Sequence, residues 1–330
     1  MVRRPKPTAL RETSGEPTTR CIPGRRLLAS VSVADPTNSA ASSSYRLRQG
    51  SGASRPLLLM IPNGSSNSND PGRTNLARFL RLGGACPASY GPGERDFFPV
   101  LPDAPNIRFL AGRPQNAPFL AARGDIDAFI AFEDVHHEAE EAGISSVQKL
   151  LDLPFSTVSV VVVAREQALC CTLADLLERS PCPIECAADL PFLARRAFRE
   201  EAVYQRRFGS TPPAIEMHGT RIASGCEEVR ITVSAGSTEP LVASGFYDSG
   251  VVVLATGRTI GACGLKVIST IGTYAPALFC RADVRGDPHL MPALEGYVRR
   301  LERAKGTWQN FQAWRQLDLP YERGTNAQGF

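Results

Sequence analysis

One stretch decides the fold expected of this chain: Gly250-Val251-Val252-Val253-Leu254-Ala255-Thr256-Gly257-Arg258-Thr259-Ile260. Its first half is a buried strand of β-branched residues, after which small residues turn the chain into a helix. At such a turn, unpaired backbone N–H groups and the helix dipole point at one spot, and Gly257 lets an anion approach the main chain. The hydroxyls of Thr256 and Thr259 add donors, and Arg258 supplies a neutralising charge. The pattern predicts a phosphate site, although turns of this kind are also common where nothing binds.

Composition limits the class of protein. The 330 residues are 43% hydrophobic and 21% charged, which predicts two domains with sizeable cores. A net charge of +4 argues against nucleic acid as a partner, because proteins on phosphate backbones carry far more positive charge. The longest apolar run, Val158 to Ala164, is strand-sized, whereas a bilayer span needs about 20 residues. We therefore expect a soluble protein that neither spans nor binds a membrane.

Cysteine and histidine raise the question of a metal site. Nine cysteines without dense regular spacing indicate reduced thiols in the cytoplasm. Three groups of residues have metal-ligating side chains: Cys170 with Cys171, Cys182 with Cys186, and His136 with His137, Glu138, Glu140 and Glu141. The cysteines lack zinc spacing, so core or surface thiols are the preferred interpretation. The histidines lie in a charge run that ends near Gly143, and such a run is usually the solvated face of a helix.

The first 54 residues differ from the rest of the chain. They are rich in Ser, Pro, Thr and Arg and have neither a helical nor a strand period, which predicts a disordered N-terminal arm. Up to Arg55 there are ten basic and three acidic residues, a net charge of +7. This composition is also typical of an organelle transit peptide. A plain tail, or a start site placed too far upstream, explains it equally well.

From Pro56 onward, apolar runs of strand length alternate with helical patterns, which predicts α/β architecture with parallel sheets. The expected strands cover residues 57–61, 107–111, 127–132, 158–163, 230–233 and 250–254. The expected helices cover residues 76–82, 118–123, 169–179, 191–208 and 290–303. Residues 209–226 look like an insertion.

Four motifs follow one another between Ile231 and Ile268: Gly236-Ser237-Thr238-Glu239, Tyr247-Asp248-Ser249, Thr256-Gly257-Arg258-Thr259 and Ala262-Cys263-Gly264-Leu265. In order and intervals they resemble the motifs of the HisG-type ATP phosphoribosyltransferase family of histidine biosynthesis. Three upstream segments also resemble the family: Met60-Ile61-Pro62-Asn63-Gly64, Phe109-Leu110-Ala111-Gly112-Arg113-Pro114 and Gly124-Asp125-Ile126-Asp127-Ala128. The likeness spans about residues 56 to 283.

The resemblance implies two α/β lobes similar to a type II periplasmic binding protein, with substrates between them. Lobe I would comprise residues 55–151 and 266–283, and lobe II residues 152–265, followed by a C-terminal helical tail, 284–330. The 47 residues after Asp283 are too few for the regulatory domain of long family members. Short members work with a partner resembling histidyl-tRNA synthetase, so the resemblance implies a regulatory partner subunit or a homo-oligomer. Trp308, Phe311 and Trp314 would pack on the body or on a second subunit.

The implied reaction joins N1 of ATP to C1 of phosphoribosyl pyrophosphate and releases pyrophosphate, with Mg²⁺ on the departing phosphates. Such chemistry depends on positioning and charge stabilisation. By resemblance, the phosphoribosyl pyrophosphate site comprises Thr256, Gly257, Arg258 and Thr259. Glu239 and Asp248 would face the ribose or its metal, whose ligands stay unknown. The acceptor site would comprise Arg113, Asn63, Gly64 and Asp127.

Several of these residues also have structural interpretations: Asp248 as a turn cap, Glu239 as a helix N-terminal acid and Arg113 as a salt-bridged surface residue. The chain also departs from the family pattern. Asn63 and Ser65 stand where cations are common, and Val252 stands where an acid is common. These losses indicate either a changed acceptor, as in a paralogue of secondary metabolism, or a non-catalytic binding or regulatory protein.

Overall fold

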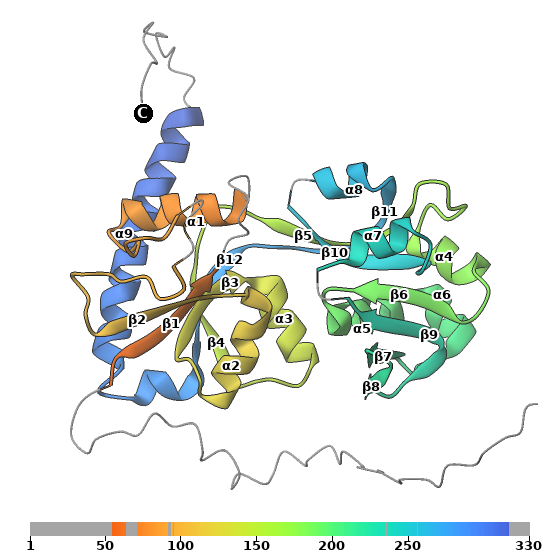
Figure 1. Cartoon of the computed structure of the whole chain (residues 1–330), viewed down its shortest axis with the longest axis horizontal. Helices are drawn as coiled ribbons and strands as arrows, with labels where there is room; N and C mark the ends of the chain where they lie inside the picture. The colour runs from red at the N-terminus through yellow and green to blue at the C-terminus, as the bar shows by residue number, and fades with distance from the viewer. Residues whose placement is uncertain are drawn as a thin grey trace, which may run out of the picture. The chain divides into compact units, whose positions relative to one another are not determined.

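The computed structural model describes residues 55–63, 71–91, 94, 96–234, 236–255 and 257–316, without the side chains of 71–74 and 312–316. The predicted arm, residues 1–54, lies outside the described residues, as do Gly64, Ser65, Thr256 and the side chain of Trp314. The described part of the chain falls within one compact unit. It contains two sheets, each flanked by helices (Figure 1).

Lobe I is built on a five-stranded sheet of order β2-β1-β3-β12-β4. Its strands are β1 (Leu57–Pro62), β2 (Ile107–Gly112), β3 (Ala128–Phe132), β4 (Val147–Asp152) and β12 (Pro276–Arg281). β1 runs parallel to β2 and β3, whereas β12 runs antiparallel to β3 and β4. The helical elements of this lobe are α1 (Pro71–Leu82), η1 (Pro114–Asn116), α2 (Ala117–Arg123), α3 (Glu133–Glu141), η2 (Ala282–Gly286) and α9 (Met291–Gln316).

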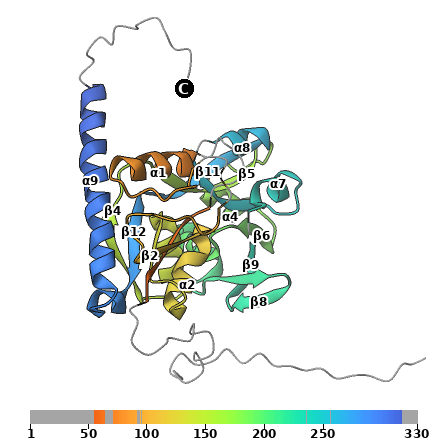
Figure 2. The same cartoon turned by 60° about the vertical axis from the view of Figure 1, so that its left-hand side comes forward.

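The C-terminal helix α9 belongs to the core of lobe I and is not an appended tail. It packs beside α1 (Figure 2). Its buried residues share one apolar cluster with residues of β1 and β2. The approach is close at Gly83, where a Cβ would lie only 2.0 Å from the carbonyl oxygen of Arg300. Trp308 packs edge-on against Phe79, with ring centroids 6.2 Å apart. Its predicted packing on the body is therefore observed, while Phe311 is half exposed.

Lobe II is built on a seven-stranded sheet of order β11-β5-β10-β6-β9-β7-β8. Its strands are β5 (Val158–Arg165), β6 (Ile184–Ala188), β7 (Pro213–Met217), β8 (Thr220–Ala223), β9 (Cys226–Val233), β10 (Ser249–Leu254) and β11 (Leu265–Tyr274). Its helices are α4 (Leu173–Arg179), α5 (Pro191–Glu200), α6 (Ala202–Phe208), α7 (Thr238–Ala243) and α8 (Arg258–Ala262). β10, β6, β9 and β7 are parallel, and β5 is antiparallel to both β10 and β11.

The chain crosses between the sheets twice, as a two-lobed α/β protein requires. It leaves lobe I between Asp152 and Val158 and returns at Ala275, between β11 and β12. The predicted return after Leu265 is wrong, because residues 265–274 pair with β5 and remain in lobe II. The two-lobed α/β fold class is confirmed. The sheets are mixed and not purely parallel, since strands next to the crossings run antiparallel.

Local differences from the expected elements have local causes. The helix expected over 191–208 is broken at Glu201, whose backbone is extended (φ −69°, ψ 128°). The helix expected from residue 169 begins only at Leu173, because Thr172 and Asp175 form a reciprocal capping box. Residues 209–226 contain the β7–β8 hairpin, which extends the edge of the lobe II sheet. Among the described residues, no helix combines the length and apolar composition that a membrane span requires.

Candidate functional site

Three parallel strands of lobe II end on one edge of the sheet and bring most of the predicted phosphoribosyl site together. Asp189 follows β6, the segment from Ser234 to Glu239 follows β9, and the segment from Ala255 to Thr259 follows β10. In open α/β sheets, ligands bind outside the carboxyl ends of parallel strands. This edge is therefore the natural place for a ligand in lobe II.

The turn after β10 has the backbone that the sequence predicts. Gly257 adopts φ 73°, in the left-handed region that favours glycine, and α8 starts at the next residue (Figure 1). A Cβ on Gly257 would meet Leu254 Cδ1 at 3.5 Å, an ordinary contact, so the backbone and not the space demands glycine. Arg258 and Thr259 are exposed, while Ile260 is buried and anchors the short helix. The turn thus presents a guanidinium and a hydroxyl to solvent at the sheet edge.

The Gly236–Glu239 segment is held by Asp189, a residue that the sequence analysis missed. The Asp189 carboxylate accepts hydrogen bonds from the Gly236 N–H (2.9 Å) and the Thr238 hydroxyl (2.8 Å). Thr238 is fully buried against Gly250, where a Cβ would lie 2.7 Å from its Cγ2. The signal that could have found Asp189 is an acid directly after the small buried residues of β6. Glu239 follows in the first turn of α7 and lies on the predicted edge.

Asp248 is not part of this group. It precedes β10, whereas the phosphate turn follows it, so the six-residue strand separates them by about 20 Å. Its carboxylate accepts the Glu185 N–H at 2.9 Å, and its own N–H donates to the Glu185 carbonyl. The prediction that Asp248 faces the ribose is wrong. Its structural role, starting β10 beside β6, explains its contacts.

In lobe I, two of the predicted acceptor residues lie together. Asn63 follows β1 and Arg113 follows β2, and these two strands pair in register up to Pro62 and Gly112. The Asn63 N–H donates to the Gly112 carbonyl at 2.7 Å, which fixes the two strand ends against each other. Arg113 is exposed and makes no ion pair with any described residue. The carboxyl edge of lobe I therefore presents an available cation and an amide.

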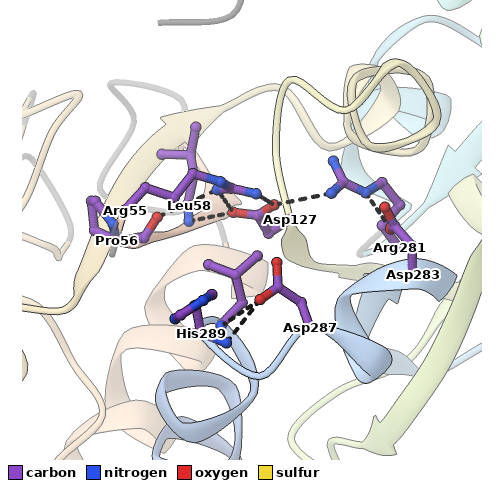
Figure 3. Close-up of polar contacts among 9 residues, drawn as sticks. Arg55, Pro56, Leu58, Asp127, Arg281, Asp283, Asp287 and His289 are labelled. Carbon is purple, nitrogen blue, oxygen red and sulfur yellow. Dashed lines mark hydrogen bonds and ion pairs between the residues drawn. The ribbon is translucent and has the colours of Figure 1, made fainter. Parts of the chain in front are cut away.

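Asp127, the remaining predicted acceptor residue, lies at the opposite edge of the lobe I sheet and is buried. Figure 3 shows its carboxylate between two arginines. Arg55 donates two hydrogen bonds to it (2.5 and 2.6 Å), Arg281 lies at 3.6 Å, and the Leu58 N–H donates at 2.9 Å. The hydrogen bonds to Asp127 raise the pKa of Arg55. The acceptor-binding prediction for Asp127 is wrong, because its carboxylate is buried and already bound by Arg55, Arg281 and the Leu58 N–H.

Only part of the histidine and acid run in α3 is a solvated face, because Glu140 is exposed but some other members are not. Asp134, His136 and Glu138 are buried, and the His136 ring packs 4.8 Å from that of Phe279. The outer histidine, His137, contacts Glu140 at 3.0 Å. Within the described part of the chain, no three His, Cys, Asp or Glu side chains are grouped to hold a metal ion. The cysteines described there all carry free thiols.

These observations define a two-lobed α/β protein with a glycine turn at the carboxyl edge of lobe II and an exposed arginine at the carboxyl edge of lobe I. The profile of the HisG family, ATP phosphoribosyltransferase, matches residues 113–302, more than half of the chain. The chain therefore belongs to this family, as its motifs predict.

Two known proteins show how far the similarity extends. The chain is 27% identical over 221 residues to ATP phosphoribosyltransferase 1 of Geobacter sulfurreducens. That match covers 64% of this chain and 62% of the relative, less than two thirds of its length. The solved ATP phosphoribosyl transferase (HisG:HisZ) complex from Thermotoga maritima is similar with a TM-score of 0.52 at 17% identity, covering 77% of this chain and 100% of that one. The structural similarity shows a shared fold.

Proposed function

We propose that this protein is a phosphoribosyltransferase that joins phosphoribosyl pyrophosphate to ATP or a related heterocyclic acceptor and releases pyrophosphate. The observation that carries the proposal is the pairing of the Gly257 turn with the Asp189-held segment on one sheet edge. Both lie within the part of the chain that matches the family. The pathway would be histidine biosynthesis or a secondary-metabolism branch with a different acceptor.

In this proposal, lobe II holds the sugar phosphate. The N–H groups after Gly257, the Thr259 hydroxyl and the Arg258 guanidinium bind the 5′-phosphate, because all three are donors to an anion. Glu239 would lie beside the ribose. The bond from C1 to the pyrophosphate oxygen breaks with its electron pair on oxygen, and a ring nitrogen of the acceptor forms the new bond to C1. The protein positions the two substrates and stabilises charge, and no residue becomes covalently modified.

Lobe I would bind the acceptor. Arg113 is available for a phosphate or for stacking on a purine, and the Asn63 side chain follows the adjacent strand. Gly64 and Thr256 stay predictions for the acceptor and the phosphate, respectively.

Magnesium is part of the proposal as an ion shared with the substrate. Mg²⁺ typically binds through one or two carboxylates together with substrate phosphates and water. The described residues fit that mode and not a dedicated metal cage, since Glu239 alone of the two predicted acids lies at the phosphate edge. When bound there, Mg²⁺ would neutralise charge on the leaving pyrophosphate.

A second candidate is a non-catalytic binding or regulatory protein on the same fold. Val252, where the family commonly has an acid, is buried in an apolar cluster with Val161, Val163 and Ile260. An acid four residues before the turn is therefore absent, which favours binding without turnover. Both candidates predict binding of a phosphorylated ligand, so only chemistry separates them.

The test is release of pyrophosphate from phosphoribosyl pyrophosphate and Mg²⁺ with a panel of purine and other heterocyclic acceptors. Release of pyrophosphate with one acceptor, weakened in Arg258→Ala, supports the transferase. Binding of phosphoribosyl pyrophosphate by calorimetry without release under any acceptor supports the non-catalytic candidate. Absence of both would remove the phosphate-site interpretation.

A regulatory partner subunit or a homo-oligomer is also proposed, from the family resemblance. Sedimentation of the purified chain at several concentrations measures self-association. A monomer that is inactive alone but active with a histidyl-tRNA-synthetase-like subunit would identify the partner arrangement.

A further inference from the structure

Helix α5 of lobe II is capped by a residue of lobe I. Its own N-cap position is Leu190, whose side chain has no acceptor for the free N–H groups of the first turn. The two N–H groups that need an acceptor both donate to the Glu138 carboxylate on α3: Phe192 to Oε1 at 2.9 Å and Leu193 to Oε2 at 2.7 Å. The start of α5 therefore depends on a carboxylate from the other lobe.

The capped end of α5 lies next to the candidate site. Only Leu190 and Pro191 separate Asp189 from the capped residues. The Asp189 N–H donates to Val251 in β10, and its carboxylate holds Gly236 and Thr238. Two residues thus connect the first turn of α5 to Asp189, and the hydrogen bonds of Asp189 connect it to the Gly236–Glu239 segment.

The contact between Glu138 and α5 is buried. Glu138 is 6% exposed, and an ion pair between the same two helices joins Arg196 to Glu141 at 2.9 Å. Two acidic groups of α3, Asp134 and Glu141, act on Glu138. Glu141 in turn pairs with Arg196 of α5, and Tyr274 of β11 interacts with Arg196 and Asp134. Burial raises the pKa of Glu138 to about 7. Burying a carboxylate costs free energy unless it forms hydrogen bonds, and Glu138 accepts two of them from the N–H groups of Phe192 and Leu193.

We propose that Glu138 is a positioning residue, which fixes the start of α5 from lobe I and thereby holds Asp189 and the Gly236–Glu239 segment in place for the substrate. The proposal rests on the proposed function for the identity of that substrate, phosphoribosyl pyrophosphate. The coupling from Glu138 in lobe I to the Gly236–Glu239 segment does not depend on the identity of the substrate. Glu138 contacts no reacting atom in this role.

The test is residue-resolved amide hydrogen exchange of the full chain at pH 8, where Glu138 is mostly ionised. Glu138→Ala removes both acceptors, and we expect exchange at Phe192 and Leu193 to rise about 10- to 100-fold, as for the loss of charge-assisted hydrogen bonds. We also expect faster exchange at Gly236, whose N–H is bound to Asp189. Glu138→Gln keeps one oxygen acceptor and should give a smaller rise at the same amides. Glu138→Gln also replaces Glu138→Ala as the test variant if the alanine variant does not fold.

The matched control is Glu140→Gln on the exposed side of the same helix, which should leave all three amides unchanged. Faster exchange at Phe192 and Leu193 with no change at Gly236 would overturn the proposal, because the cap would then be purely structural. An equal effect from Glu140→Gln would overturn it too. A parallel measurement of KM for phosphoribosyl pyrophosphate should show a rise in Glu138→Gln. If wild type neither binds nor turns over this substrate, the proposed function fails while the exchange result still decides the coupling.

Discussion

Substitutions in the turn after β10 test the phosphate site most directly. Arg258 is exposed and Thr259 is its neighbour at the start of α8, so each can be removed without opening a core cavity. A charge-assisted hydrogen bond contributes about 1.5 to 3 kcal/mol, which corresponds to about 10- to 150-fold in affinity. Because the Arg258 side chain is exposed and screened by solvent, we expect the loss of affinity in Arg258→Ala to be near the lower end of this range, about 10-fold. The Thr259 hydroxyl would donate to the same anion, so this hydrogen bond is also charge-assisted and Thr259→Ala should weaken binding about 10-fold or more.

Gly257→Ala acts through the backbone. At φ 73° an alanine is strained by about 1 to 2 kcal/mol, which should lower the free energy of unfolding by that amount. The Cβ would also stand where the main chain must approach the phosphate, so affinity should fall further than in either side-chain variant. A plain turn with no ligand predicts the opposite ranking, with a stability loss at Gly257 and no change at Arg258.

Isothermal titration of phosphoribosyl pyrophosphate into wild type and the three variants measures these affinities, and urea unfolding measures their stabilities. The control is Asp248→Asn, which alters the far end of β10 and should leave the affinity unchanged. Unchanged affinity in both Arg258→Ala and Thr259→Ala, with folded proteins, would refute the reasoning and remove the main support for a phosphoribosyltransferase.

Three further predictions concern acidic side chains. Asp127→Asn leaves two arginines without their carboxylate and should cost about 3 to 5 kcal/mol of stability with no change in ligand affinity, by urea unfolding and calorimetry. Burial raises the pKa of Asp134 from 3.8 to about 6, so the native state binds the proton more tightly than the unfolded chain. Stability from this group is therefore complete below about pH 4 and falls by about 3 kcal/mol as pH rises through 6. Asp134→Asn should reduce that slope between about pH 4 and 6, where the native and unfolded states bind different numbers of protons, and an unaltered slope would contradict the assignment. Asp189→Ala should weaken phosphoribosyl pyrophosphate binding about 10-fold or more by releasing Gly236 and Thr238, whereas equal affinity would show that their segment does not touch the ligand.

Local patterns in the sequence were sufficient for the strand and turn at residues 250–260, for several other elements and for the family. β-Branched runs and glycine turns depend on neighbours a few residues away, so they can be recognised without the fold. The order of residues along a strand is equally local. The sequence order already places Asp248 before β10 and the phosphate turn after it. The role that the family resemblance implies for Asp248 does not fit this order. Asp127, before β3, is the same case.

Only the tertiary structure decided which distant residues meet. The extent of β11 in lobe II depends on pairing with β5, a strand about 100 residues away, and nothing within residues 265–274 indicates that partner. Asp189 gains its role from a loop about 50 residues later in the chain. The acids of α3 predict a solvated helix face, because charged side chains are usually exposed to water. In the fold, two N–H groups of α5 donate to Glu138, and this allows its carboxylate to be buried. A carboxylate's burial depends on what packs against it, and that is a property of the folded chain and not of the segment that carries the acid.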